Sequence, residues 1–136
     1  MAFRVVCDIF VIVHADMPPS AEDWSEMSRL RDACAVRLKG QLVVAPPRAI
    51  IDARQRADVK MFWQRSHVSL AILTDSRLVR GAAIAVAWFG VTVRAWPPEC
   101  IDEAMAFLVV PVERRDEVRQ AAMALAAEVR GSSPRV

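Results

Sequence analysis

Residues 67–90 read HVSLAILTDSRLVRGAAIAVAWFG, and this stretch decides the fold class. Its first eight residues form an apolar run that predicts a buried β-strand. Asp75 or Ser76 can cap the helix that follows, which we expect to run to about Phe89, with Gly90 at its end. A buried strand joined by a short cap to a helix is the repeating unit of an α/β protein.

The same alternation continues in both directions along the chain. Residues 3–14 are apolar apart from Arg4 and Asp8, and they predict either one bent strand or a hairpin that turns near Cys7 and Asp8. Further strands are predicted at residues 41–45 and 91–96, and further helices at residues 20–39, 50–61, 99–108 and 112–130.

Apolar side chains recur at helical spacing in four of these segments and predict which face of each helix packs inward. In chain order the positions are Trp24, Met27, Leu30, Cys34 and Leu38; Ile50, Ala53, Ala57 and Met61; Ile101, Ala104, Met105 and Leu108; and Val118, Ala122, Leu125 and Val129.

Together these elements predict one α/β domain over residues 1–130, with a four- to five-stranded mixed sheet and about five helices. Strands that alternate with helices pair in parallel, because a helix supplies the long connection that parallel neighbours need. The polar residues 131–136 are expected to form a flexible C-terminal tail.

Composition excludes several classes of protein. The chain is 54% hydrophobic and has 4 glycines, which argues for a packed interior. No segment is long and uncharged enough to be a membrane span, and no secretory signal is recognised, so we expect a cytoplasmic protein. A net charge of +2 does not call for nucleic acid as a partner. Cys7, Cys34 and Cys100 are too scattered for a disulfide framework or a zinc site.

Four stretches resemble the STAS-like family, which is related to bacterial anti-sigma-factor antagonists. They are FVIVH (residues 10–14), PPSAEDW (18–24), AILTDSRLVRG (71–81) and IDEAMAFL (101–108). The resemblance implies a regulatory α/β domain. In phosphorylatable members an Asp-Ser step follows the third strand, but the matching loop here, residues 45–48, has no serine or threonine. The step at Asp75 and Ser76 lies one βα unit later.

The helix predicted at residues 77–89 is apolar on almost every side, so more than one body must cover it. The C-terminal helix, a second copy of the chain or a bound apolar ligand could supply the second cover. We therefore expect a regulatory or assembly domain that binds itself or another protein, with an apolar-ligand module as the alternative. The candidate interaction residues are Leu78, Ile84, Ala85, Trp88, Phe89 and Trp96.

A weaker candidate is a phosphate or other ligand site at Asp75, Ser76, Arg77 and Arg80, although a serine before an apolar helix is usually its cap. A catalytic arrangement of His14 with Asp75 and Ser76 is conceivable at the strand ends. No nucleophile elbow, glycine-rich phosphate loop or metal-binding motif accompanies it. We therefore predict a non-enzymatic protein without metal or cofactor.

Overall fold

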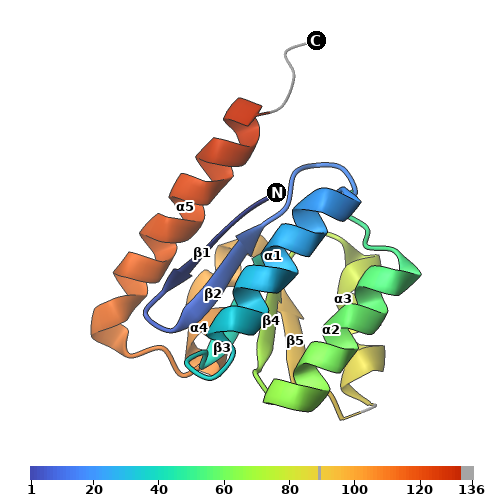
Figure 1. The fold of residues 1–136 in the computed structure, drawn as a ribbon. Coiled ribbons are helices and arrows are strands. Elements are labelled where there is room, and N and C mark those ends of the chain that lie inside the picture. The colour runs from blue at the N-terminus through green and yellow to red at the C-terminus, as the bar shows by residue number, and fades with distance from the viewer. Residues whose placement is uncertain (89, 133–136) are drawn as a thin grey trace.

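A computed structural model describes residues 1–88 and 90–132 and shows a sheet between two layers of helices (Figure 1). The five strands are β1 (Ala2–Val6), β2 (Ile9–Val13), β3 (Gly40–Val44), β4 (Leu70–Leu73) and β5 (Val93–Trp96). The helices are α1 (Ala21–Cys34), α2 (Ala53–Ser66), α3 (Arg77–Ala87), α4 (Ile101–Phe107) and α5 (Arg115–Ser132), with short 3-10 turns η1 (Pro98–Cys100) and η2 (Val112–Arg114). The predicted α/β class, with a mixed sheet and five helices, is confirmed.

The chain begins with a β-hairpin, one of the two forms that the sequence left open. Strands β1 and β2 pair antiparallel, and Cys7 and Asp8 join them with φ angles of 51° and 63°. Two consecutive positive φ values define a type I′ turn, whose twist matches that of the strands it connects.

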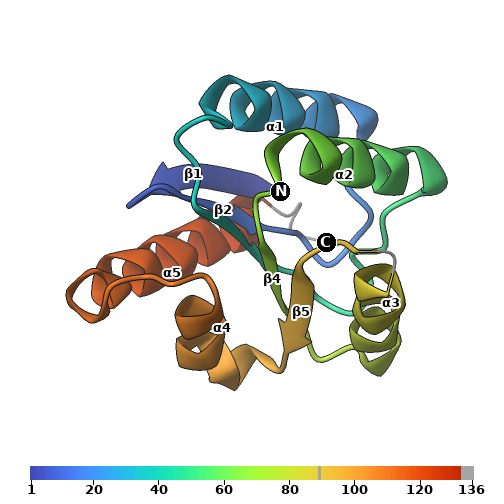
Figure 2. The same ribbon diagram turned by 90° about the horizontal axis from the view of Figure 1, so that it is seen from below.

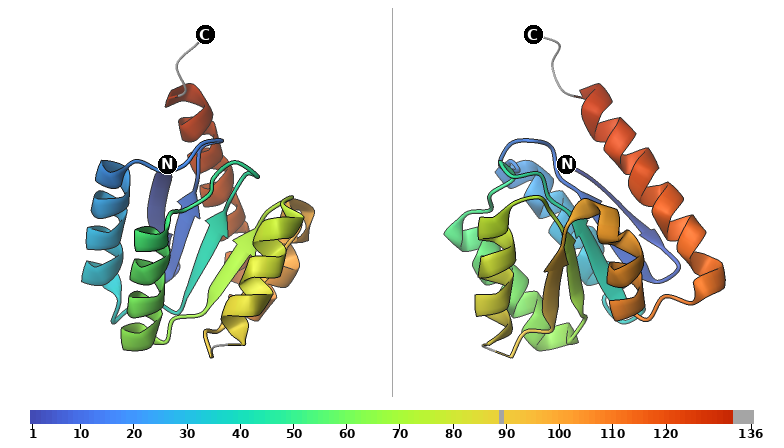
Figure 3. Two further views of the ribbon diagram at one scale, coloured as in Figure 1. Left: turned by 90° about the vertical axis from the view of Figure 1, so that its right-hand side faces the viewer. Right: turned by 180° about the vertical axis from the view of Figure 1, so that it is seen from behind.

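The sheet order is β1-β2-β3-β4-β5, and every pair from β2 to β5 is parallel. Each crossover steps one strand further in the same direction, and right-handed crossovers then place α1, α2 and α3 on one face. Figures 2 and 3 show α4 and α5 on the opposite face. Strand β2 is buried on both faces, which explains its unbroken apolar sequence.

The inward faces predicted for the last two helices are confirmed. Ala104, Met105 and Leu108 of the α4 segment are buried, as are Val118 and Leu125 of α5. Residues 131 and 132, expected to start the tail, lie in α5 instead, and residues 133–136 lie outside the described part of the chain.

The faces predicted for the first two helices are partly wrong. Helix α1 ends at Cys34, well before Gly40, and Leu30 is exposed while its neighbour Arg31 is buried. In α2 the side chains of Gln55 and Phe62 are buried. The four predicted positions Ile50, Ala53, Ala57 and Met61 are exposed. In both helices a polar side chain occupies a buried position, which apolar spacing cannot reveal.

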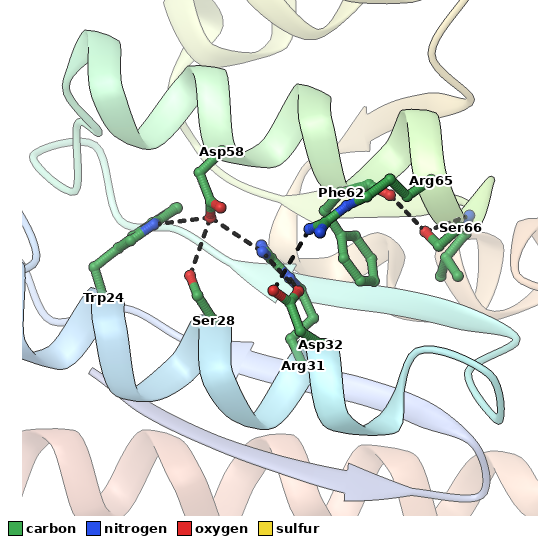
Figure 4. A network of polar contacts seen from close by, with 9 residues as sticks. Trp24, Ser28, Arg31, Asp32, Asp58, Phe62, Arg65 and Ser66 are labelled. Carbon is green, nitrogen blue, oxygen red and sulfur yellow. Dashed lines mark hydrogen bonds and ion pairs between the residues drawn. The ribbon is translucent and has the colours of Figure 1, made fainter.

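Arg31 is buried because it links α1 to α2 (Figure 4). The Asp58 carboxylate of α2 accepts hydrogen bonds from Trp24 Nε1 at 3.0 Å, Ser28 Oγ at 3.0 Å and Arg31 Nη2 at 3.1 Å. The Arg31 guanidinium also lies 4.2 Å from the ring centroid of Phe62. A charge that is only 1% exposed is therefore met by an anion and an aromatic face.

Asp32 and Arg65 extend this network to the surface. Asp32 accepts a second bond from Arg31 at 3.2 Å, and Arg65 lies 3.5 Å from the other Asp32 oxygen. Burial alone would raise the pKa of Asp58, but the charge of Arg31 and the three donated hydrogen bonds hold that pKa below its ordinary value. The stability that Asp58 contributes is present above pH 3.8 and is lost as the pH falls below it.

We expect Asp58→Ala to lower the free energy of unfolding by roughly 2–3 kcal/mol, because it leaves Trp24 and Ser28 without their acceptor and the buried Arg31 with Asp32 as its one remaining carboxylate. Arg65→Ala is the matched control. It removes only an exposed ion pair and should cost less than about 1 kcal/mol. Urea denaturation measures both, and equal costs would show that the buried network does not hold α1 to α2.

Helix α4 ends in a Schellman motif with an unusual residue in its left-handed position. Val110 N–H donates to the Met105 carbonyl at 2.9 Å, and Val109 N–H donates to Ala106 at 3.0 Å. Val109 has a φ of 58°, where glycine is the usual residue. A β-branched side chain in this conformation is strained, and this one is 82% exposed.

Val109→Gly should therefore raise the free energy of unfolding by roughly 0.5–1 kcal/mol, since strain relief exceeds the entropy cost of glycine. Val112→Gly is the control, because Val112 is also exposed but does not have a positive φ. The control should be destabilised in the same urea titration. A loss of stability in Val109→Gly would mean that the strain is absent.

Candidate functional site

Helix α3 leaves most of its apolar side chains uncovered. Its only buried residue is Ala83, which packs with Val91 and Val93 beside β5. Leu78 is 76% exposed and Trp88 is 85% exposed. Ile84, Ala85 and Val86 are exposed as well. This surface contains most of the residues that the sequence proposed for an interaction.

The second cover expected for α3 does not come from the C-terminal helix. Helix α5 packs on β1 and β2, on the opposite face of the sheet and at its far side (Figure 2). The hypothesis that α5 covers α3 is therefore wrong. The right-handed crossovers explain why, since they bring α3 to the last strand of the sheet, beyond which the described chain has no further layer.

The middle of the exposed face consists of small residues. Gly81 and Ala85 lie one helical turn apart, with Leu78 on one side of them and Ile84 and Trp88 on the other. A Cβ added at Gly81 would have no atom within 4 Å, so packing within the chain does not require this glycine. Glycine inside a helix costs about 1 kcal/mol relative to alanine. Gly81 is not among the interaction residues predicted from the sequence, although an isolated glycine in a helical pattern is a recognisable signal.

Trp96 and Phe89 do not join this surface in the structure. Trp96 faces the other side of the sheet, where its ring centroid lies 5.4 Å from that of Phe107 of α4. Alternation along β5 explains the placement, because Val93 and Ala95 point to α3 and Trp96 points away. Phe89 lies outside the described residues.

Ser76 is the N-cap of α3, as its position before an apolar run predicted. Its Oγ accepts the Val79 N–H at 3.2 Å, and its own N–H donates to Thr74 Oγ1 at 3.1 Å. Arg80 is also engaged, because its guanidinium donates to the Thr74 carbonyl at 3.0 Å. Asp75 and Arg77 are exposed beside the cap. The hydroxyl and one guanidinium of the weak ligand candidate thus serve the local structure.

His14 follows β2 and is buried, and it makes no hydrogen bond to Ser76 or Asp75 in the described structure. Its Nδ1 has no partner among the described residues. Desolvation, with a smaller contribution from the positive charge of the amino terminus, lowers the pKa of His14 to about 4. The imidazole is therefore neutral near pH 7 and packs as part of the interior. The catalytic arrangement conceivable from the sequence is not formed.

Comparison of the chain with protein-family models, with curated proteins and with solved structures gives no significant match. Within the described residues, none of the helices has the length and apolar content needed to cross a bilayer. The same residues contain no cluster of three or more histidine, cysteine or acidic side chains placed to hold a metal ion.

His14 predicts a specific acid sensitivity. A folded-state pKa of about 4 lies below the unfolded value of 6.5, so the unfolded chain binds the proton more readily. The contribution of His14 to the free energy of unfolding is fully present above pH 6.5. The free energy of unfolding should fall by about 3 kcal/mol as the pH drops from there toward 4. Urea denaturation at several pH values measures this slope.

His14→Gln should remove most of the loss between pH 6.5 and 4, whereas His67→Asn should keep it. His67 is the only other histidine and is exposed, and asparagine tolerates its positive φ of 54°. The same slope in wild type and His14→Gln would contradict the assignment.

Proposed function

We propose that this protein is a non-enzymatic interaction domain that pairs with a second copy of itself through the exposed face of α3. The observation that carries the proposal is the exposure of Leu78, Ile84 and Trp88 around Gly81 and Ala85. Exposed apolar residues that gather on one surface mark interaction sites, and tryptophan is the residue most enriched among interface anchors.

A two-fold axis through the exposed face of α3, level with position 83 of the helix, makes this face complementary to itself. In an antiparallel pair of α3 helices, Leu78 lies opposite Trp88 of the second copy, and Gly81 lies opposite Ala85. The small residues let the two backbones approach closely, and each Trp88 gains an apolar surface on which to pack. Such an arrangement gives an open glycine in mid-helix a physical reason, which the single chain lacks.

The charges at the helix ends favour the same arrangement. Helix α3 has no basic residue in its last turn and no acidic residue in its first, so neither end of its dipole is neutralised from within the helix. Arg77 is exposed at the positive end. Antiparallel pairing moves each Arg77 next to the negative C-terminal end of the other α3.

The proposal includes a cytoplasmic regulatory or assembly role of the STAS-like kind. The support for this role is the resemblance of the four sequence stretches at residues 10–14, 18–24, 71–81 and 101–108. A different protein as the partner, or an apolar ligand on α3, are the competing outcomes of the test that follows.

Analytical ultracentrifugation over a range of concentrations tests the pairing. We expect a monomer–dimer equilibrium that Trp88→Ala weakens by about 30-fold, the loss typical of an interface anchor. Met123→Ala is the control, since Met123 is exposed on α5, away from α3. A wild-type chain that stays monomeric at every concentration overturns the pairing with itself.

Gly81→Ala separates association from stability. The added methyl should stabilise the single chain by roughly 0.5–1 kcal/mol, because Gly81 has open space around it. The same methyl should weaken the dimer by about tenfold, because it lies where the two helices approach most closely. A variant that is more stable and still pairs normally would place the interface elsewhere.

A further inference from the structure

A pocket of about 480 Å³ lies at the opposite end of the sheet from Ser76, where the parallel strands β2 and β3 begin. Three connections that are far apart in sequence meet there: the β1–β2 turn, the loop from α1 to β3, and the loop from α4 to α5. Its volume is in the range of sites for small molecules.

Three cations and one acid line this pocket. The cations are Arg37, Lys39 and Arg114, and the acid is Asp8. Arg37 is exposed and its guanidinium donates a hydrogen bond to Cys34 Sγ at 3.5 Å, and no carboxylate of the described residues pairs with it. Lys39 Nζ lies 3.9 Å from Asp8, and both groups are exposed, which makes that pair weak.

Arg114 is paired more firmly. Its guanidinium donates to Glu117 at 2.9 and 3.3 Å. Cys7 Sγ lies 3.2 Å from the same carboxylate. Burial, and then the hydrogen bond to Glu117, raise the pKa of the Cys7 thiol. Cys7 therefore stays protonated, and its S–H donates a hydrogen bond to the Glu117 carboxylate. Cys7 and Arg114 are therefore both engaged with Glu117, and Arg37 and Lys39 are left as the cations available to a ligand.

The rest of the lining is apolar. Ile9, Leu108 and Val110 are buried beneath the pocket, and Val109 and Pro111 form its rim. The strained Val109 belongs to this rim with its side chain exposed. Strained backbone of this kind clusters at active sites and ligand-binding sites.

We propose that this pocket binds a small organic anion, a carboxylate that carries an apolar group, with the carboxylate at Arg37 and Lys39 and the apolar group against Val109 and Pro111. Guanidinium binds carboxylate through two parallel hydrogen bonds, and the apolar rim removes the alkyl group from water. The pocket and α3 share no residue, so the site is independent of the proposed pairing.

Isothermal titration calorimetry with hexanoate tests the site. We expect a Kd of about 1 mM or tighter for hexanoate. Acetate lacks the apolar group and 1-hexanol lacks the charge, so each should bind at least about tenfold more weakly. Equal binding of hexanoate and hexanol, or no binding of hexanoate up to about 5 mM, overturns the proposal.

Variants locate the bound anion. Arg37→Gln should weaken hexanoate at least about fivefold, whereas Arg54→Gln, an exposed arginine on α2, should leave it unchanged. Val109→Gly should weaken hexanoate while it stabilises the fold, a combination that a purely structural role for Val109 would not give. Trp88→Ala should bind hexanoate normally, so failure of the pocket and failure of the dimer are separate results. Unchanged affinity in Arg37→Gln overturns the site.

Discussion

The handedness of the strand-to-strand crossovers is the constraint on which the rest of this structure depends. From β2 to β5 each strand is added on the same side of the last, so right-handed connections place α1, α2 and α3 in one layer. Helix α2 lies between α1 and α3 in that layer, so α3 is an end of the row, beside the last strand β5. The same constraint leaves the other face to α4 and α5, which follow the last strand. An apolar helix at the end of the row is thus a result of topology.

Polar interactions fix the position of α1 relative to α2, in addition to the apolar packing between the layers. The helices α1 and α2 meet over Phe62, yet Arg31 lies between them, and its charge is balanced by Asp58 and Asp32. A buried arginine is costly unless it is paired. The pairing of Arg31 with Asp58 therefore favours the one relative position of α1 and α2 in which both groups meet. The hairpin turn and the Schellman motif likewise hold backbone in left-handed conformations. Both line the pocket below β2 and β3.

Local signals in the sequence predicted the elements well, because they rest on near neighbours. The Ser76 cap, the glycine stop at Gly90 and the apolar faces of α4 and α5 are all of this kind. The position of Arg31 was missed because burial of an arginine depends on Asp58, 27 residues later. The apolar character of α3 was recognised, but its exposure depends on the strand order. Trp96 lies apart from α3 because side chains alternate along β5, so that Val93 and Ala95 face α3 and Trp96 faces the opposite side. The pocket cannot be predicted from the sequence, because loops that are distant along the chain contribute its cations.

The attachment of α3 has a consequence for folding cooperativity. With Ala83 as its one buried residue, α3 should open from the sheet at a smaller free-energy cost than global unfolding, and its amides should exchange hydrogen before those of β2. A partner that binds only the closed form shifts this local equilibrium by mass action. The amides of α3 would then exchange hydrogen more slowly when a partner is bound, so the exchange rate of this helix would report whether its exposed face is covered.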